Sequence, residues 1–296
     1  MTTRYAHNGT VRIAYEDLGG AGGGPLLLVM GLGVSRHWWP AGFVSALVDQ
    51  GFHVVAYDQR DSGESTRFAD EEQVHPFTAL LRRRSGPYTA EDMTDDAVAV
   101  LDALGWASAH LFGHSMGGLL AQRIALRHQG RVRSITVSAA MPSDASGLRQ
   151  LRHVGLGFVL RASRMRFPDG PEGDVEAGLA LARAIASPGY PFDEATARAA
   201  AEREARSGIR DVRAQSRQTG VTWHGGRLAE LTVPALVLHG EQDPVVRPSA
   251  ARATAAAVPN ARLVLLSGVG HDLPRALWSR IAGEVRALAD RARAAA

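Results

Sequence analysis

Short runs of consecutive apolar residues recur along this chain, and stretches with helical spacing separate them. Because the runs are continuously apolar and do not alternate, they are typical of strands buried on both faces of a sheet. Strands that alternate with helices predict an α/β fold with a doubly wound, mostly parallel sheet. The six runs are Leu26–Met30, His53–Tyr57, Ala109–Phe112, Ser134–Val137, Ala235–His239 and Leu263–Leu266.

The helix signals lie between these runs. Thr89, with Asp92 three residues later, resembles a capping box, and apolar residues then follow helical spacing until Gly105. Before the first run, Asn8-Gly9 joins two alternating segments and predicts a type I′ hairpin. We therefore expect the sheet to begin with an antiparallel pair, and we expect further helices over Met116–His128, Pro248–Ala257 and Pro274–Ala292.

One segment, residues 142–226, interrupts the alternation. It contains no buried-strand run, only helical stretches rich in Arg, Ala and Glu that are broken by prolines. We interpret it as a helical cap inserted into a single α/β core formed by residues 1–141 and 227–296. The segment leaves the core at the carboxyl edge of the sheet, so we expect it to arch over a site there.

Composition excludes several classes of function. All 33 cationic residues are arginines, and 30 acidic residues bring the net charge to +3, so we expect no nucleic-acid partner. The basic run Arg82–Arg84 is interpreted as a solvated loop. Cysteine is absent, which excludes disulfides and thiolate chemistry.

The longest apolar runs are far shorter than the about 20 residues that a membrane span needs. The first 17 residues lack the pattern of a secretory signal, so we expect a cytoplasmic protein.

The motif Gly113-His114-Ser115-Met116-Gly117 follows a predicted strand and opens a predicted helix. This is the context of a nucleophile elbow, in which a strained turn exposes a serine hydroxyl above the sheet. A serine hydroxyl is a weak nucleophile, so it needs a histidine base that a carboxylate orients. The motif thus predicts Ser115 as a nucleophile with an acid and a histidine later in the chain.

Two later strands run into such residues. Ala235–His239 leads to Asp243, and Leu263–Leu266 leads to His271, in the order expected for this kind of site. We predict Ser115, Asp243 and His271 as the catalytic residues. Asp144 is the alternative acid, followed by Glu241. We interpret His114 and His239 as packing residues, and no histidine spacing indicates a metal, so we assign none.

Acyl transfer also requires donors at the point where negative charge develops on the substrate oxygen. One is expected from the backbone of Met116, the residue after the nucleophile. The second is expected from the loop after Leu26–Met30, where Gly31 and Gly33 flank Leu32. We predict the Leu32 and Met116 N–H groups as the oxyanion hole.

Taken together, these motifs resemble the α/β-hydrolase family over nearly the whole chain. Asp58–Ser65 is similar to the family's Asp-x-Arg-Gly-x-Gly-x-Ser turn, although Asp61 stands where Gly is usual. Met30 stands where many members have the His of a His-Gly turn. Among members, the chain is most similar to the aclacinomycin methylesterase group, in the segments Leu28–Gly33, Tyr57–Gly63 and Glu241–Pro244.

The resemblance implies a serine hydrolase of carboxylic esters, and in that group a methylesterase of polyketides. We expect a small-molecule ester as substrate and no cofactor. Trp38, Phe158 and Met165 are predicted to bind the substrate, the last two from the cap. A lactonase, a carbon–carbon bond hydrolase or a cofactor-free perhydrolase with the same triad remains an alternative, as does a non-catalytic ligand-binding module.

Overall fold

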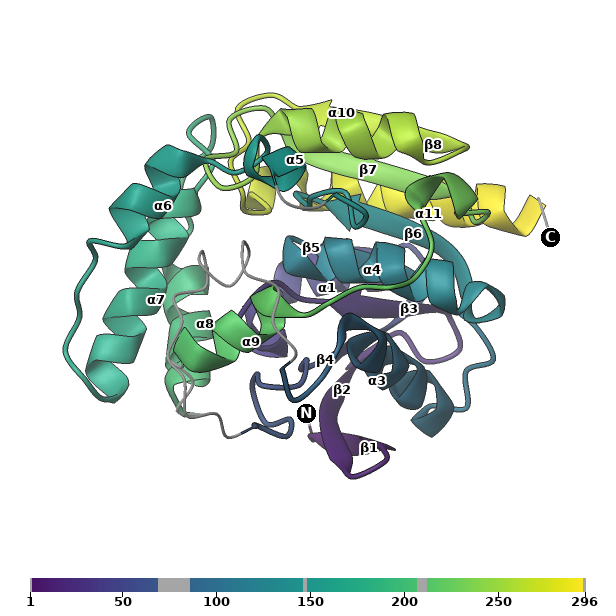
Figure 1. Cartoon of the computed structure of the whole chain (residues 1–296), viewed down its shortest axis with the longest axis horizontal. Helices are drawn as coiled ribbons and strands as arrows, with labels where there is room; N and C mark the ends of the chain where they lie inside the picture. The colour runs from purple at the N-terminus through teal and green to yellow at the C-terminus, as the bar shows by residue number, and fades with distance from the viewer. Residues whose placement is uncertain (1, 69–85, 146–147, 207–211, 295–296) are drawn as a thin grey trace.

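The computed structural model describes residues 2–68, 86–145, 148–206 and 212–294, and Arg82–Arg84 lie outside these ranges. Its centre is an eight-stranded sheet in the order β1-β2-β4-β3-β5-β6-β7-β8 (Figure 1). The pairs β1–β2 and β2–β4 are antiparallel, and all other neighbours are parallel. The strands are β1 (Arg4–Asn8), β2 (Val11–Gly19), β3 (Gly24–Val29), β4 (Phe52–Tyr57), β5 (Ala109–His114), β6 (Val132–Ser138), β7 (Ala235–Gly240) and β8 (Ala261–Leu266).

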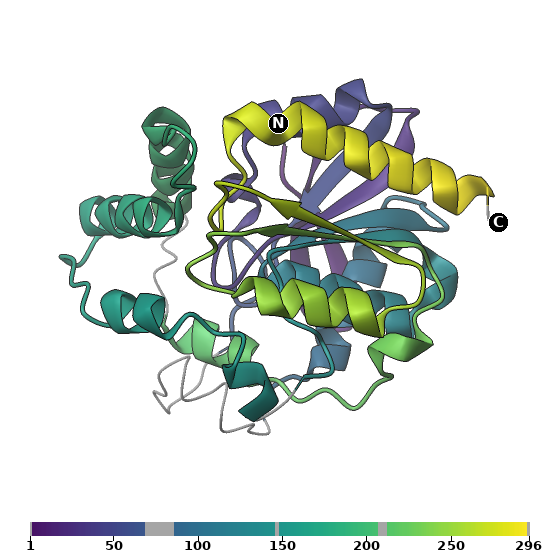
Figure 2. The ribbon, with the colours of Figure 1, turned by 90° about the horizontal axis from the view of Figure 1, so that it is seen from above.

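Helices cover both faces of this sheet. On one face α1 and α11 pack together, and on the opposite face lie α3, α4 and α10 (Figure 2). Successive β3 side chains enter opposite layers, with Leu27 and Val29 on the α3–α4 side and Leu26 and Leu28 on the α1–α11 side. These helices are α1 (Ala41–Asp49), α3 (Ala90–Ala103), α4 (Met116–Arg127), α10 (Pro248–Ala257) and α11 (Trp278–Ala294).

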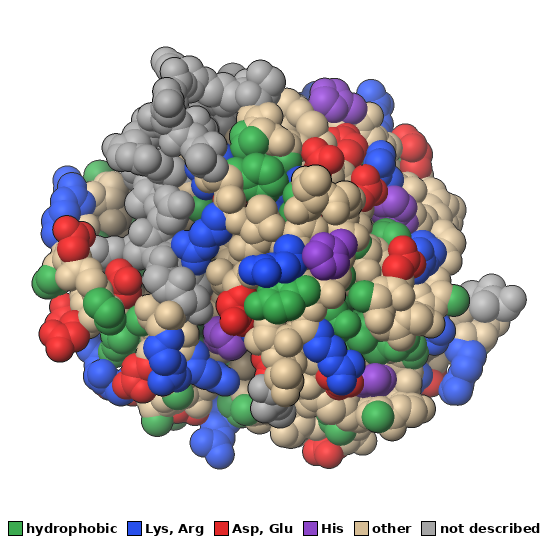
Figure 3. Space-filling view, turned by 90° about the horizontal axis from the view of Figure 1, so that it is seen from below, with side chains coloured by type: hydrophobic (Ala, Val, Ile, Leu, Met, Phe, Trp, Pro, Cys, Tyr) green, Lys and Arg blue, Asp and Glu red, His purple; other side chains and the backbone are tan. Residues whose placement is uncertain are grey.

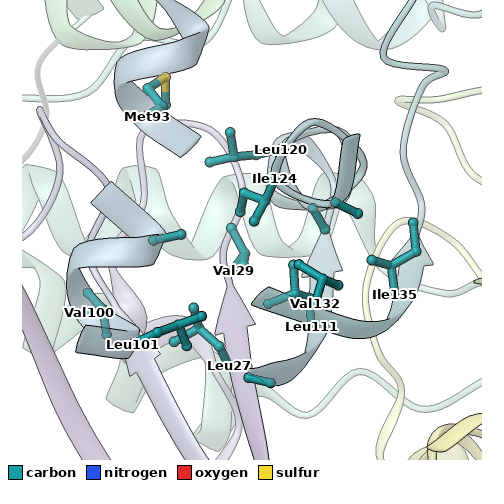
Figure 4. Close-up of a cluster of buried hydrophobic side chains, with 14 of the residues drawn as sticks. Leu27, Val29, Met93, Val100, Leu101, Leu111, Leu120, Ile124, Val132 and Ile135 are labelled. Carbon is teal, nitrogen blue, oxygen red and sulfur yellow. The ribbon is translucent and has the colours of Figure 1, made fainter. Parts of the chain in front are cut away.

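The layer beneath α3 and α4 shows why the continuously apolar runs form internal strands. Leu27, Val29 and Leu111 project from β3 and β5 toward Ile124 and Leu101 of the two helices (Figure 4). All five are at most 1% exposed. β3 and β5 therefore bury side chains on both faces, and the predicted doubly wound fold is confirmed, although the run Leu263–Leu266 belongs to the edge strand β8, in which only Leu266 is buried.

The predicted hairpin forms, but its loop lies one residue later than predicted and its turn is not of type I′. Asn8 pairs with Val11, so Gly9 and Thr10 form the two-residue loop. Of these two, only Gly9 has a positive φ, +57°. A type I′ turn needs positive φ at both central residues, whereas glycine at the first position is the mark of type II′. The β-branched Thr10 avoids the left-handed region, so a loop of Gly9 and Thr10 does not form a type I′ turn.

A group of helices lies beyond the carboxyl edge of the sheet, at the left of Figure 1. The pair α7–α8 packs around Leu179, Ala182 and Ala197. These helices come from the segment that we interpret as a cap, and we retain its limits, residues 142 and 226, as a prediction. The helices at the left are α6 (Leu156–Ala162), α7 (Pro171–Ile185), α8 (Glu194–Arg206) and α9 (Val212–Gly220), and the short α5 (Leu148–Leu151) of the same segment lies nearer to α10.

The surface mixes charges of both signs. On the face shown in Figure 3, arginine and acidic side chains are interspersed among the described residues. None of the helices in the described ranges combines the length and the apolar character needed to cross a bilayer.

Candidate active site

Ser115 stands at the junction of β5 and α4 in a strained conformation. Its φ of 56° and ψ of −123° place a non-glycine residue in the left-handed half of φ/ψ space, at a cost of about 1–3 kcal/mol. A Cβ at Gly117 would meet the Val29 carbonyl oxygen, and one at Gly113 would meet Gly117 itself. The two glycines therefore let helix and strands approach closely enough to hold the turn, as a nucleophile elbow requires.

The structure brings the three predicted catalytic side chains together. His271 Nε2 lies 2.9 Å from Ser115 Oγ, and His271 Nδ1 lies 2.7 Å from Asp243 Oδ2. The other oxygen of Asp243 accepts hydrogen bonds from the N–H groups of Val245 (2.8 Å) and Val246 (2.9 Å). Because Asp243 is held by the backbone, it can orient the imidazole so that Nε2 faces the serine hydroxyl.

The alternative acids lie elsewhere. Asp144 Oδ2 accepts a hydrogen bond from the Leu228 N–H at 3.2 Å, so this carboxylate caps a short 3₁₀ helix. Glu241 is exposed to solvent. Neither residue forms a hydrogen bond with His271, which leaves Asp243 as the acid that the geometry supports.

Two further histidines flank the triad. Burial, together with the nearby His271, lowers the pKa of His114 to about 3, and its ring lies 5.2 Å from that of His271. Burial also lowers the pKa of His239, whose Nε2 lies 2.8 Å from the Val246 carbonyl. Both side chains are therefore neutral at physiological pH, in agreement with their interpretation as packing residues. His239 is incompletely satisfied, since its buried Nδ1 has no partner among the described residues.

Contacts from the end of α7 hold the loop that carries His271, and sequence reasoning missed them. The His271 N–H donates to the Ile185 carbonyl at 2.9 Å. The Gly270 N–H donates to Ser187 Oγ at 2.9 Å, and the Ser187 hydroxyl donates to Asp272. No sequence motif marks these bonds. The Ile185 carbonyl is a backbone group that any residue has, and a single serine such as Ser187 is not distinctive.

The predicted oxyanion donors lie beside the nucleophile. Leu32 and Met116 line the same cavity as Ser115 and His271. Among the described residues, no protein group accepts a hydrogen bond from either backbone N–H. They follow β3 and β5, adjacent strands at which the sheet order reverses, and open α/β sheets bind their ligands at such a switch point.

A cavity of about 660 Å³ lies above the triad, between the core and the helices α6–α9. Two of the three predicted substrate-binding residues, Trp38 and Phe158, line it. Met165 follows the end of α6 and does not line the cavity. The remaining wall is largely apolar and includes Val159, Leu181, Phe192, Val221 and Trp278.

A half-buried carboxylate anchors the far end of the oxyanion loop. Glu204 of α8 accepts hydrogen bonds from the N–H of Ser35, at 3.1 Å to its nearer oxygen, and from the Ser35 hydroxyl. Burial raises the pKa of Glu204 to about 7, and nearby Asp58 adds to this, although Ser35 and Arg67 oppose it. The folded protein therefore keeps a proton on Glu204 at pH values where the unfolded chain has lost it.

We expect this carboxyl to make stability depend on pH. Because the folded state binds the extra proton, the free energy of unfolding should fall as pH rises from about 4.5 to about 7. Glu204→Gln keeps an acceptor for Ser35 but does not ionise. Between about pH 5 and about pH 8, the native protein should lose about 2 kcal/mol more than this variant. Urea unfolding at both pH values measures this difference, and parallel profiles for the two proteins would contradict it.

No three His, Asp or Glu side chains gather as metal ligands would within the described ranges. The absence of a metal or cofactor from the chemistry stays a prediction.

Comparison with known proteins identifies the class to which this fold and site belong. Residues 24–274 match the alpha/beta hydrolase fold family, so the chain belongs to that family. Rhodomycin D methylesterase DnrP of Streptomyces peucetius is 30% identical over 310 aligned positions, covering 96% of this chain and 97% of the relative. Rhodomycin D methylesterase DauP of Streptomyces sp. (strain C5) is 29% identical with the same coverage. The predicted resemblance is thereby confirmed.

Solved structures show the same fold. The esterase RhEst1 from Rhodococcus sp. ECU1013 superposes with a TM-score of 0.75 at 24% identity, covering 98% of this chain and 99% of that one. The meta-cleavage product hydrolase CumD from Pseudomonas fluorescens IP01 gives a TM-score of 0.70 at 21% identity, covering 99% and 98%. The family and the methylesterase relatives support the prediction of a carboxylic ester hydrolase.

Proposed function

We propose that this protein is a serine hydrolase that cleaves carboxylic esters, with methyl esters of bulky acids as its natural substrates. The hydrogen bonds that join Ser115, His271 and Asp243 carry the proposal, together with the adjacent N–H groups of Leu32 and Met116, which have no acceptor among the residues that the structure describes. The two methylesterases that align over nearly the full chain support the choice of ester and of methyl alcohol as the leaving group.

The first half of the reaction forms an acyl-enzyme. Ser115 Oγ attacks the ester carbonyl carbon while His271 Nε2 takes the hydroxyl proton. The carbonyl oxygen becomes an anion, which the N–H groups of Leu32 and Met116 stabilise. The C–O bond to the alcohol then breaks, and the proton on His271 passes to the leaving methoxide. Asp243 stabilises the imidazolium between these two transfers.

The second half regenerates the enzyme. A water molecule attacks the acyl carbon as His271 takes one of its protons, and a second oxyanion forms in the same hole. Collapse of this intermediate breaks the bond to Ser115 Oγ, which recovers its proton from His271. The products are the free acid and methanol, and no redox change or external cofactor enters the balance.

The shape of the cavity supports a large acyl group. Its volume of about 660 Å³ far exceeds what a methyl group needs, and its wall carries Trp38 and Phe158. An apolar wall of this size favours a bulky, largely hydrophobic acid. The small alcohol then has to occupy only the space next to His271.

The proposal is tested by an activity assay on the purified protein. Methyl esters of polycyclic aromatic acids are compared with p-nitrophenyl esters of increasing acyl length, and the acid and methanol are quantified. We expect hydrolysis of the bulky methyl esters and labelling of Ser115 by a fluorophosphonate probe. Turnover of lactones or carbon–carbon substrates alone would replace the ester assignment, and absence of both labelling and turnover would indicate a binding module.

We expect Phe158 to determine preference for bulky acids. Phe158→Ala should raise KM for a bulky ester by about tenfold while leaving kcat for an acetate ester within about tenfold, because it removes binding energy without touching the oxyanion donors. Met165→Ala is the matched control, since Met165 comes from the same segment but lies outside the cavity. Steady-state kinetics on both esters measure the effect. Equal losses on the two esters would mean that Phe158 has a structural role and does not select the acid.

A further inference from the structure

The loop that carries the second oxyanion donor lacks the histidine that many family members have at its start. Met30 occupies that position, and Gln59 Nε2 donates a hydrogen bond to the Met30 carbonyl oxygen. This bond holds the peptide unit between Met30 and Gly31. The Leu32 N–H belongs to the next peptide unit, so its direction depends on what holds the loop on the other side.

That other side is held by α9. The Gln218 side chain is buried, with 2% of its surface exposed. Its Oε1 accepts a hydrogen bond from the Gly33 N–H at 3.0 Å. Its Nε2 donates to the Arg60 carbonyl at 2.7 Å and to Ser62 Oγ at 2.9 Å. One amide therefore joins the oxyanion loop to the turn after β4.

The neighbouring residue fixes α9 in place. Arg217 donates to both oxygens of Asp61, at 2.8 Å and 2.9 Å, and the Tyr88 hydroxyl donates to the same carboxylate at 2.6 Å. Asp61 stands at a position where the family turn usually has glycine. It is buried and has a φ of 67°. A buried, bidentate pair of this kind is strong and geometrically specific. The unusual Asp61 thus anchors the helix that carries Gln218.

These hydrogen bonds hold the peptide units on both sides of the one that contains the Leu32 N–H. Gln59 holds the peptide unit before it, through the Met30 carbonyl, and Gln218 holds the peptide unit after it, through the Gly33 N–H. Gly33 has a φ of +65°, so the chain turns sharply at the point where Gln218 holds it. With both flanking peptide planes held, the plane between them has little freedom to rotate.

We propose that Gln218 is a positioning residue for the oxyanion hole, which holds the Leu32–Gly33 peptide so that the Leu32 N–H faces the oxygen of the reacting ester. The proposal rests on the proposed esterase function. It assigns a helix of the predicted cap to transition-state stabilisation, in addition to any contact that the helix makes with substrate.

The test replaces Gln218 with residues that differ in the groups they keep. Gln218→Met preserves length and removes all three hydrogen bonds. Gln218→Asn keeps the amide but is one methylene too short to reach both partners. We expect either change to lower kcat by about 10- to 100-fold with KM within about threefold, since loss of a whole oxyanion donor costs about 10²- to 10³-fold. Gln218→Glu keeps an acceptor for the Gly33 N–H and should recover most of kcat.

The matched control is Ser62→Ala, which removes one Gln218 partner on the turn and leaves the Gly33 contact intact. Its kcat should equal that of the native protein. A second readout is affinity for a boronic acid, which bonds to Ser115 Oγ and places an oxygen in the oxyanion hole. Its inhibition constant should rise in parallel with the loss of kcat in Gln218→Met, a change that a purely structural role would not produce.

Thermal unfolding shows whether each variant folds. A folded Gln218→Met or Gln218→Asn with native kcat would overturn the proposal, as would loss of KM alone or an unchanged boronic acid affinity. If Gln218→Met does not fold, Gln218→Asn carries the test. Failure of the native protein to react with a fluorophosphonate would instead overturn the proposed function, so the two failures are distinguishable.

Discussion

Ser115→Ala is expected to lower kcat for ester hydrolysis by about 10⁴- to 10⁶-fold while the protein stays folded and still binds substrate. In the proposed mechanism the hydroxyl supplies the oxygen that forms the acyl-enzyme and the proton that His271, 2.9 Å away, accepts. Residual turnover would come from the oxyanion donors and binding alone. Steady-state kinetics measure the loss, and competitive inhibition by the product acid measures retained binding.

The control for this variant is its stability. Ser115 has a strained φ of 56°, and alanine at the same position keeps a Cβ and therefore the same strain. The unfolding temperature should change little, so a loss of activity is not a loss of fold. Near-native turnover of activated esters by Ser115→Ala would remove Ser115 as the nucleophile and the acyl-enzyme with it.

Asp243→Asn is expected to lower kcat by about 10⁴-fold. An asparagine amide at this position favours the wrong tautomer of His271, so Nε2 no longer accepts the serine proton. The carboxylate oxygen that faces His271 is 2.7 Å away, and the other is held by two backbone N–H groups, so the substitution leaves the loop in place. Kinetics with a p-nitrophenyl ester measure the loss.

The comparison variant is Asp144→Asn. Asp144 is the alternative acid from sequence, but its carboxylate accepts a hydrogen bond from Leu228. Asn can accept the same bond, so this change should leave kcat within about twofold. A large loss in Asp144→Asn with little change in Asp243→Asn would reverse the assignment of the acid.

The three predicted catalytic residues could be selected from the sequence because local patterns mark their positions. A nucleophile elbow needs small residues on both sides of Ser115, and Gly113 and Gly117 are visible in sequence. Asp243 and His271 each follow an apolar run that indicates a strand, although the first run forms the internal strand β7 and the second forms β8 at the edge of the sheet. Parallel strands end at one edge of a sheet, so residues that follow them meet there.

The choice of substrate-binding residues was less predictable. Phe158 and Met165 have similar hydrophobicity and lie seven residues apart, yet only Phe158 lines the cavity. Phe158 lies on α6, whereas Met165 follows the end of that helix, so the point at which the helix ends separates the two side chains. In a segment with irregular apolar spacing, the sequence does not show where such a helix ends or which of its faces lines the cavity.

The sequence by itself determined the sheet, its helical layers and the order of Ser115, Asp243 and His271, because hydrophobic periodicity and turn chemistry act over a few residues. Only the tertiary structure decided what holds the site. Gln218 contacts Gly33 across 185 positions, Arg217 pairs with Asp61 across 156, and Ile185 accepts from the His271 N–H. These bonds join a backbone group or a common polar side chain to a distant partner. Such pairs leave no local pattern, so they emerge only when packing brings the segments together.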